Sequence, residues 1–432
     1  MSESWVAEAV RSVATVILSG VDKHIVAGEI PTNLCNYLDV YRNRRLTKGM
    51  SFAGGTATQD EIARFSLKKG DVLITKDSET PDDIGIPALV VDSLPNTICG
   101  YHLAILRPCN RLDPRFLLHY LQSDAAKRHF LRMANGVTRF GLGAKAIASL
   151  SIPVPPLDEQ TDIARVLDAV DSALDSTRIA VNRARIARNS LLADLLTHGI
   201  DNDGKVRRQD SSQFVRTAVG TVPASWTLST VGSEFELQNG FTLNEGRQAR
   251  FRKRRYLRVA NVQRDSLSLA DIYELEASDS EFAPRVLAED DLLVVEGHAD
   301  RMQIGRCARV TREAVGMTFQ NHLFRLRSMG RAVPAFGCLW LNSQYAQRFW
   351  NAHCATSSGL NTINQRTLRK LIFPVPSTEE QCEIVKLVAA QRMHLDALAK
   401  QFQCLESLKR SLVRDLMTGR VRLSDQARMV AS

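Results

Sequence analysis

The densest group of chemically active side chains in this sequence is basic. It lies between residues 247 and 258, a stretch that contains no acidic residue and has Phe251 and Tyr256 among its cations. These cations are Arg247, Arg250, Arg252, Lys253, Arg254, Arg255 and Arg258. A smaller group beside Tyr41 consists of Arg42, Arg44, Arg45 and Lys48. Basic side chains with interleaved aromatic rings favour contact with nucleic-acid phosphates, so both groups are predicted to bind DNA. A solvated basic loop without function is the alternative.

Polar side chains also gather just ahead of two long predicted helices. In the first half of the chain they are Arg132, Asn135, Thr138, Arg139 and Lys145. In the second half they are Asn361, Asn364, Gln365 and Arg366. Arg, Asn and Gln form paired hydrogen bonds with base edges in the major groove, so these residues are further candidates for DNA binding.

Catalytic motifs, by contrast, are missing from the sequence. There is no phosphate-binding loop of the type G-x-x-x-x-G-K-[ST], no G-x-S-x-G and no H-E-x-x-H. The cysteines include no C-x-x-C pair, which excludes the usual zinc-site spacings. His102 and His322 recur at equivalent positions, and we interpret them as a duplicated core histidine. We therefore expect no catalytic residue, no metal and no cofactor, with an enzyme of unrecognised site as the alternative.

An internal repeat positions all of these residues. Residues 153–195 and 374–416 align without a gap, and each copy opens with Pro-Val-Pro followed by Glu-Gln. The preceding segments repeat as well, because Asp71, His102 and Pro114 recur as Asp291, His322 and Pro334. The shared positions are mostly apolar or structural, while the polar positions between them differ. One fold with two polar surfaces suggests two readers of two different targets.

Apolar residues at alternating steps of three and four predict a long helix in each copy and a coiled coil between the two. The first seam is Ile163, Leu167, Val170, Leu174, Val181, Leu191 and Leu195. The second seam is Ile384, Val388, Leu395, Leu398, Phe402, Leu405, Leu412 and Leu416. Arg188 and Lys409 interrupt the seams at matching places. Since a globular segment precedes each helix and the connection is short, we expect antiparallel pairing over roughly 48 Å. Two long helices buried in one large core are the alternative.

The predicted fold class is mixed α/β (α+β), with pseudo-two-fold symmetry. We expect a globular domain over 1–152, a helix within 153–200 and a linker over 201–222. A second domain over 223–373, a second helix within 374–421 and a tail over 422–432 follow. In the first domain we expect strands over 71–75 and 101–106 and one helical stretch from Asp113 to Phe130.

The composition is that of an ordinary water-soluble protein with a basic surplus. Lys and Arg total 56 against 47 Asp and Glu, which gives a net charge of +9 and a pI near 9.2. A surplus of this size favours a polyanionic partner. No apolar run is long enough to span a membrane and no secretion signal is recognisable, so a cytoplasmic location is expected.

Two variable globular domains, each followed by a proline-rich, Glu-Gln-bearing helix start, resemble the specificity (S) subunit of bacterial type I restriction-modification systems, the HsdS family. The resemblance rests on Pro153-Val154-Pro155 with Glu159-Gln160 and on Pro374-Val375-Pro376 with Glu380-Gln381. Val222-Pro223 with Trp226 also looks like that family's domain opening. The first domain departs from the pattern, because no proline precedes Trp5.

The resemblance implies two target-recognition domains, each binding one half of a bipartite, asymmetric site in double-stranded DNA. It also implies that the helices space the domains and dock two modification (methyltransferase) subunits, which restriction (ATP-dependent translocase and endonuclease) subunits join later. The chain itself would then be non-catalytic, and the methyl donor, ATP and magnesium would belong to its partners. A coiled-coil adaptor without DNA binding and the specificity subunit of a related modification system of another type are the alternatives.

Overall fold

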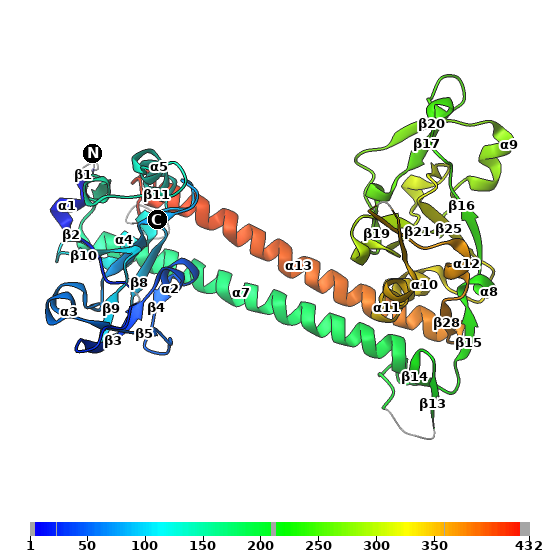
Figure 1. Ribbon diagram of the computed structural model, residues 1–432, viewed down its shortest axis with the longest axis horizontal. Helices are drawn as coiled ribbons and strands as arrows, with labels where there is room; N and C mark the ends of the chain where they lie inside the picture. Colours follow the sequence, from blue (N-terminus) through cyan, green and yellow to red (C-terminus); the bar gives the residue numbers. More distant parts are fainter. Residues whose placement is uncertain (1–4, 23, 209–212, 358, 424–432) are drawn as a thin grey trace, which may run out of the picture. The chain divides into compact units, whose positions relative to one another are not determined.

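The computed structural model describes residues 5–22, 24–208, 213–357 and 359–423 (Figure 1). The chain divides into two compact units. Unit 1 comprises Met1–Ile179 with Ala399–Ser432, and unit 2 comprises Ala180–Leu398. Each unit contains one globular domain, the start of one long helix and the end of the other. We describe each unit by itself.

The domain of unit 1 is built on a five-stranded sheet with the order β2-β10-β6-β8-β4. These strands are β2 (Ala14–Leu18), β10 (Leu103–Pro108), β6 (Val72–Thr75), β8 (Pro87–Val90) and β4 (Arg45–Leu46). Neighbouring strands are antiparallel except β4 and β8. Side chains alternate between the two faces of a strand, so Val72 and Ile74 join one core while Leu73 joins another. The sheet is therefore buried on both faces.

Helices cover one face of this sheet and a small second sheet covers the other. The helical side has α1 (Val10–Val13), α4 (Pro114–Leu121), α5 (Asp124–Met133) and α6 (Ala144–Ala148). The other side has β3 (Ile30–Cys35), β5 (Ala53–Ala57) and β9 (Thr97–Cys99), with α2 (Tyr37–Arg42) and α3 (Gln59–Phe65). Short pairs complete the domain: β1 (Val6–Ala9) with β12 (Ser151–Val154), and β7 (Asp77–Ser78) with β11 (Phe140–Gly141).

The domain of unit 2 repeats this plan. Its main sheet has the order β16-β25-β21-β23, from β16 (Phe235–Asn239), β25 (Leu323–Ser328), β21 (Leu292–Val295) and β23 (Cys307–Arg309). A second sheet combines β20 (Tyr273–Glu276), β17 (Lys253–Leu257) and β24 (Thr318–Phe319). The helices are α8 (Val231–Glu234), α9 (Asp279–Phe282), α10 (Pro334–Leu341), α11 (Gln344–His353) and α12 (Gln365–Arg369). The remaining strands are β15 (Thr227–Thr230), β18 (Val262–Gln263), β19 (Ser266–Leu267), β22 (Gly297–His298), β26 (Ala355–Ser357), β27 (Leu360–Thr362) and β28 (Ile372–Val375).

An ion pair with a buried carboxylate recurs at the same place in both domains. Arg107 donates from Nε and Nη2 to the Asp71 carboxylate at 2.7 and 2.8 Å. Arg327 donates in the same way to Asp291, at 2.7 Å for both bonds. Both carboxylates are 1% exposed. The predicted repeat is thus present at the level of individual scaffold contacts.

One predicted element is wrong in its extent. The helical stretch expected from Asp113 to Phe130 is two helices, because α4 ends at Leu121 and α5 begins at Asp124. Ser123 lies between them with extended backbone angles, and its hydroxyl accepts a hydrogen bond from the Ala126 amide at 3.3 Å. A serine in this position caps the N-terminus of a new helix.

The long helices are α7 (Leu157–His198) and α13 (Thr378–Leu416), and they run antiparallel in both units. In unit 1, Ile163 and Leu167 near the start of α7 share a core with Leu416 near the end of α13. In unit 2, Leu195 near the end of α7 shares a core with Ile384 near the start of α13. The buried seam residues, each 8% exposed or less, are Ile163, Leu167, Leu174, Leu195, Ile384, Val388 and Leu416. The half-buried ones are Val170, Val181, Leu191, Leu395, Leu398, Phe402, Leu405 and Leu412.

The Glu-Gln pair that opens each long helix attaches the helix to its domain. Gln160 is fully buried; its Oε1 accepts from the Asp113 amide at 2.8 Å, and its Nε2 donates to two backbone carbonyls. Gln381 makes the equivalent three bonds, beginning with the Val333 amide at 2.7 Å. The indole N–H groups of Trp5 and Trp226 donate to Glu159 and Glu380, each at 3.2 Å. The repeated motif is therefore a structural joint.

The segment expected as a linker contains ordered structure of its own. Strands β13 (Phe214–Thr217) and β14 (Gly220–Pro223) form an antiparallel hairpin, and Val222 is buried in the core of unit 2. Arg207, just ahead of the hairpin, pairs with both oxygens of Glu380 at 2.5 and 3.0 Å. The expected tail falls mostly outside the described residues.

Candidate nucleic-acid interface

The small basic group is only partly available to a ligand. Arg44 pairs with Asp171 and, at 2.8 Å, with Asp175, and Arg45 pairs with Asp168 at 2.7 Å. All three carboxylates lie on α7. DNA contact by Arg44 and Arg45 stays a prediction, and in this structure their guanidinium groups join the domain of unit 1 to the helix. The acidic residues responsible lie more than a hundred positions away in the sequence, so no local pattern could reveal them. Arg42 and Lys48 are exposed and their side chains have no ionic partner among the described residues.

The same docking surface contains a buried histidine and the lysine that interrupts the seam. His119 is 0% exposed, and its Nε2 lies 3.0 Å from Oδ1 of Asp168. Burial opposes ionisation of Asp168, but the hydrogen bond with His119 and the charges of His119 and Arg45 outweigh it and lower the pKa of this carboxyl. Lys409 lies 2.7 Å from Asp171, and burial lowers the pKa of its ammonium group. This network replaces apolar packing at one place on the seam.

The large basic group is half neutralised by acidic residues that follow it in the chain. Its partnered members are Arg247 with Glu281 at 2.6 Å, Lys253 with Glu274 at 3.8 Å, Arg254 with Asp279, and Arg258 with Asp271 at 2.5 Å. Hydrogen bonding by Arg247 is the main reason that the pKa of Glu281 falls to about 2. Residues 247–258 contain no acidic residue, but the fold brings acidic side chains from residues 271–281 next to them and lowers the local positive charge.

Three members of the group remain available for phosphate contact. The side chains of Arg250, Arg252 and Arg255 are exposed and have no partner among the residues that the structure describes. Phe251, between them, is 92% exposed. The backbone amides of residues 250–252 all donate to the carboxylate of Glu276, which fixes this turn. The group thus presents a rigid turn with free cations at its surface.

The amide side chains expected to read bases in unit 2 are used inside the domain. Asn361 is 8% exposed and donates to the Ala299 carbonyl at 2.8 Å. Asn364 caps α12 by accepting from the Thr367 amide at 2.8 Å, and Gln365 donates to the Leu237 carbonyl at 3.0 Å. Base contact by these three stays a prediction, and in this structure their hydrogen-bonding groups support turns and helix ends. Arg366 is exposed.

The corresponding residues of unit 1 lie at the surface. Arg132, Asn135, Thr138, Arg139 and Lys145 are all exposed. The side-chain amide of Asn135 donates to the nearby Met133 carbonyl at 3.3 Å. The charged groups of the two arginines and of Lys145 have no partner among the described residues. These side chains are therefore free to contact DNA, and their predicted role in DNA binding stays a prediction.

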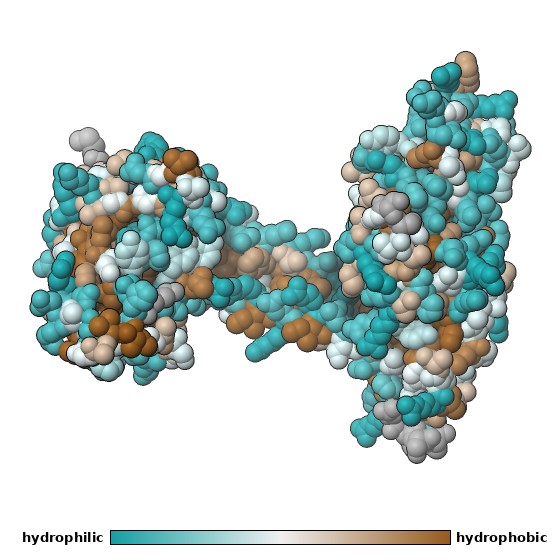
Figure 2. Space-filling model, in the orientation of Figure 1, coloured by the Kyte–Doolittle hydropathy of each residue, from teal (hydrophilic) through white to brown (hydrophobic). Residues whose placement is uncertain are grey.

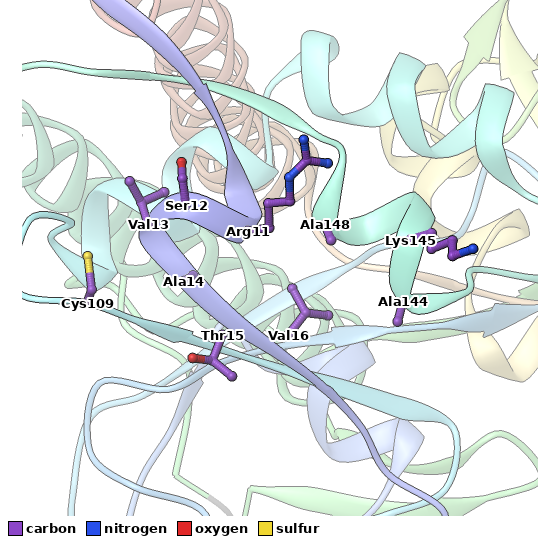
Figure 3. A pocket seen from close by; sticks show the side chains of 10 residues that line it. All are labelled: Arg11, Ser12, Val13, Ala14, Thr15, Val16, Cys109, Ala144, Lys145 and Ala148. Atoms are coloured by element: carbon purple, nitrogen blue, oxygen red, sulfur yellow. The ribbon is translucent and has the colours of Figure 1, made fainter.

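Lys145 lies on a pocket with a second cation that the sequence did not single out. The pocket has a volume of about 470 Å³ and is lined by Arg11 of α1, Lys145 of α6 and residues of β2. Figure 3 shows both charged side chains extending from its rim. In unit 2 the equivalent positions are Gly232 and Arg366, and the stem of Arg369 packs over Gly232, 2.9 Å from where a Cβ would lie. Each unit therefore places two cations at this site, although from different positions of the repeat.

The two equivalent histidines are not core residues, which corrects our interpretation of them. The side chain of His102 is 36% exposed and its Nδ1 lies 2.8 Å from Oδ2 of Asp77. The side chain of His322 is 42% exposed and its Nδ1 lies 3.3 Å from Oε2 of Glu296. Burial raises the pKa of Glu296, and the charge of His322 opposes that shift.

Within the described residues, no three His, Cys, Asp or Glu side chains are grouped so that they could hold a metal ion. No helix in the same part of the chain is long and apolar enough to cross a bilayer.

Known proteins share both sequence and fold with this chain. Residues 36–183 match the family model described as the type I restriction modification DNA specificity domain. The chain is 21% identical over 367 residues to a putative type I restriction enzyme MjaX specificity subunit of Methanocaldococcus jannaschii, covering 84% of this chain and 81% of that protein. It is 22% identical over 307 residues to the type I restriction enzyme EcoKI specificity subunit of Escherichia coli, covering 70% of this chain and 63% of that protein.

Solved structures agree with the sequence comparisons. The type I restriction-modification S subunit from M. genitalium matches with a TM-score of 0.53 at 16% identity, over 96% of both chains. The HsdS subunit from Thermoanaerobacter tengcongensis matches with a TM-score of 0.51 at 17% identity, over 98% of both chains. The chain therefore contains a segment that matches a type I restriction modification DNA specificity domain, and over most of its length it is similar in sequence and fold to type I specificity subunits.

Proposed function

We propose that this chain is the DNA sequence-recognition subunit of a type I restriction-modification complex. In this proposal each globular domain binds one half of a bipartite, asymmetric site in double-stranded DNA. One observation carries it: the two domains share their scaffold contacts, while exposed polar side chains at several equivalent positions differ. The pairs Asp71–Arg107 and Asp291–Arg327 are the same, while the positions of Lys145 and Asp77 hold Arg366 and Gly297 in the second domain.

Phosphate contact is assigned to a selected set of exposed cations, each without an ion-pair partner among the described residues. In unit 1 these are Arg11, Arg42, Lys48, Arg132, Arg139 and Lys145. In unit 2 they are Arg250, Arg252, Arg255, Arg366 and Arg369. Each cation that neutralises a phosphate releases condensed counterions, so binding should weaken steeply as salt rises.

Partner docking is assigned to the outer faces of the long helices. Ile179 and Ile186 of α7 are 49% and 68% exposed, and Met393 of α13 is 72% exposed. These residues lie away from the seam, and Figure 2 shows apolar side chains at the surface of the helices among polar ones. Apolar side chains repeated on an outer helix face favour packing by further helices. We assign this surface to two modification subunits, one per repeat, with restriction subunits joining that complex.

The chain is proposed to be non-catalytic, so the methyl donor, ATP and magnesium belong to its partners. The experiment that tests the function is a map of methylated positions across the host genome, with and without this chain. Loss of one bipartite methylated motif when the chain is removed supports the proposal. An unchanged methylation map, together with no affinity of the chain for duplex DNA, would favour a protein adaptor instead.

A further inference from the structure

His102 and His322 occupy the same corner of their two domains. His102 immediately precedes β10 and its carbonyl accepts from the Lys76 amide at 3.0 Å. His322 immediately precedes β25 and its carbonyl accepts from the Glu296 amide at 2.9 Å. Both strands lie inside the main sheet, next to β6 in unit 1 and β21 in unit 2. The backbone therefore delivers the two rings to equivalent places.

The carboxylates that hold these rings come from different positions of the repeat. In unit 1 the partner is Asp77, the first residue of β7. The equivalent first residue of β22 is Gly297, and the carboxylate comes from the preceding residue, Glu296. A Cβ at Gly297 would lie 3.4 Å from Nδ1 of His322, an ordinary van der Waals contact, so the ring of His322 lies directly beside this position. The two domains thus hold the same imidazole by different means, which indicates that the ring is what both require.

The side chains around each ring differ between the domains. In unit 1, β7 pairs with β11, and the exposed turn ahead of β11 carries Arg139 and Val137, the latter 93% exposed. Lys76 lies over the half-exposed ring of Tyr101 at 4.4 Å. In unit 2, β22 pairs with β27, and the neighbouring polar side chains are His298 and Thr356. A constant ring within variable polar surroundings is the arrangement that two readers of different sequences need.

The geometry also fixes which atom faces outward. Nδ1 of His102 lies 2.8 Å from Asp77, and Nδ1 of His322 lies 3.3 Å from Glu296 without a hydrogen bond. Nε2 of each ring is therefore left for another partner, and among the described residues it has none. A neutral ring held in this way presents an acceptor at Nε2, and a protonated ring presents a donor. Either form can bond a base edge, since amino groups and ring nitrogens both lie in the major groove.

We propose that His102 and His322 are specificity-determining residues, each contacting a base edge of one half-site through Nε2, with Asp77 and Glu296 as the residues that position them. This inference rests on the proposed function. It places the reading edge of each domain at the corner where the main sheet meets the β7–β11 or β22–β27 pair. The basic turn at residues 250–255 then contributes affinity without sequence preference.

The test uses the full chain with its modification subunits and maps methylated positions in cells. H102A should relax or abolish the preference at one half-site and leave the other intact, and H322A should do the reverse. Binding of the purified complex to a duplex carrying the mapped site should fall about tenfold or more, the effect of losing one base-pair contact. His24→Ala is the matched control, because His24 is an exposed histidine between β2 and β3 to which no DNA contact is assigned, and it should change neither measurement.

Conservative variants separate reading from folding. H102Q keeps a polar side chain of similar length and should shift the preferred base at the same half-site, and D77N should weaken discrimination at that half-site alone. If H102A lowers the melting temperature, the methylated motif of H102Q is used in its place to test whether the ring contacts a base. A bipartite motif that is unchanged in H102Q and H322A overturns the inference and leaves the proposed function standing. A wild-type chain that directs no methylated motif overturns both.

Discussion

Replacing the buried glutamine of the first helix joint gives a sharp test of how the helices are attached. Gln160 makes three hydrogen bonds, at 2.8 Å from the Asp113 amide and at 2.9 and 2.8 Å to the carbonyls of Arg111 and Pro155. Gln160→Leu keeps the volume roughly constant and leaves these three buried backbone groups without that partner. At about 1 kcal/mol per lost bond, the variant should lose about 3 kcal/mol of stability.

The assay is hydrogen exchange at the amide of Asp113, which loses its acceptor in the variant. Exchange of this amide should accelerate by about two orders of magnitude, since each 1.4 kcal/mol corresponds to a factor of ten. Gln381→Leu should act in the same way on the Val333 amide and leave Asp113 protected. The control is Gln403→Leu, an exposed position of α13 that should change neither amide. If the Asp113 amide exchanges equally slowly in the Gln160 variant, Gln160 does not attach the helix to the domain in the way described.

Three further predictions concern charge, acid stability and spacing. Replacing Arg250, Arg252 and Arg255 with alanine should weaken binding to every duplex and flatten the salt dependence by about 0.9 for each lost phosphate contact. Arg254→Ala, whose guanidinium is already paired with Asp279, is the control and should change the slope less. Because the pKa of Asp168 is lowered by folding, its ionised form contributes stability above the unfolded value, and this contribution is lost as pH falls below about 4. Urea unfolding of Asp168→Asn should therefore lose less stability between neutral and acid pH than the wild type, and equal losses would contradict the network. Adding about seven residues to both α7 and α13 keeps the seam in register and adds roughly 10 Å, which should widen the unread DNA spacer by about three base pairs. A variant that methylates at the original spacing would show that the helices do not set it.

Patterns with a fixed period were predictable from the sequence. The heptad seams and the repeated Pro-Val-Pro and Glu-Gln segments located both long helices, and the repeated Asp71 and Asp291 located equivalent strands. Such patterns survive in a single sequence because helix and strand geometry impose them locally. The structural role of the Glu-Gln pair could not be predicted from the sequence, because Gln160 accepts its hydrogen bond from a loop almost fifty residues earlier in the chain.

Charge and hydrogen bonding were less predictable, because partners distant in sequence decide them. Arg44 and Arg45 have the composition of a phosphate site, but α7 supplies their carboxylates. Asn361 has the amide of a base reader, but a turn of its own domain occupies it. The histidines were interpreted as core residues because recurrence alone does not distinguish a buried ring from one held at the surface.

The most direct test of the central claim is an exchange of one domain. Residues 223–373 are replaced by the matching segment of a related specificity subunit, and methylated positions are mapped in cells that contain the modification subunits. If each domain reads its own half-site, one half of the methylated motif changes to that of the donor and the other half stays the same. A motif that changes in both halves, or in neither, would contradict two independent readers on one scaffold.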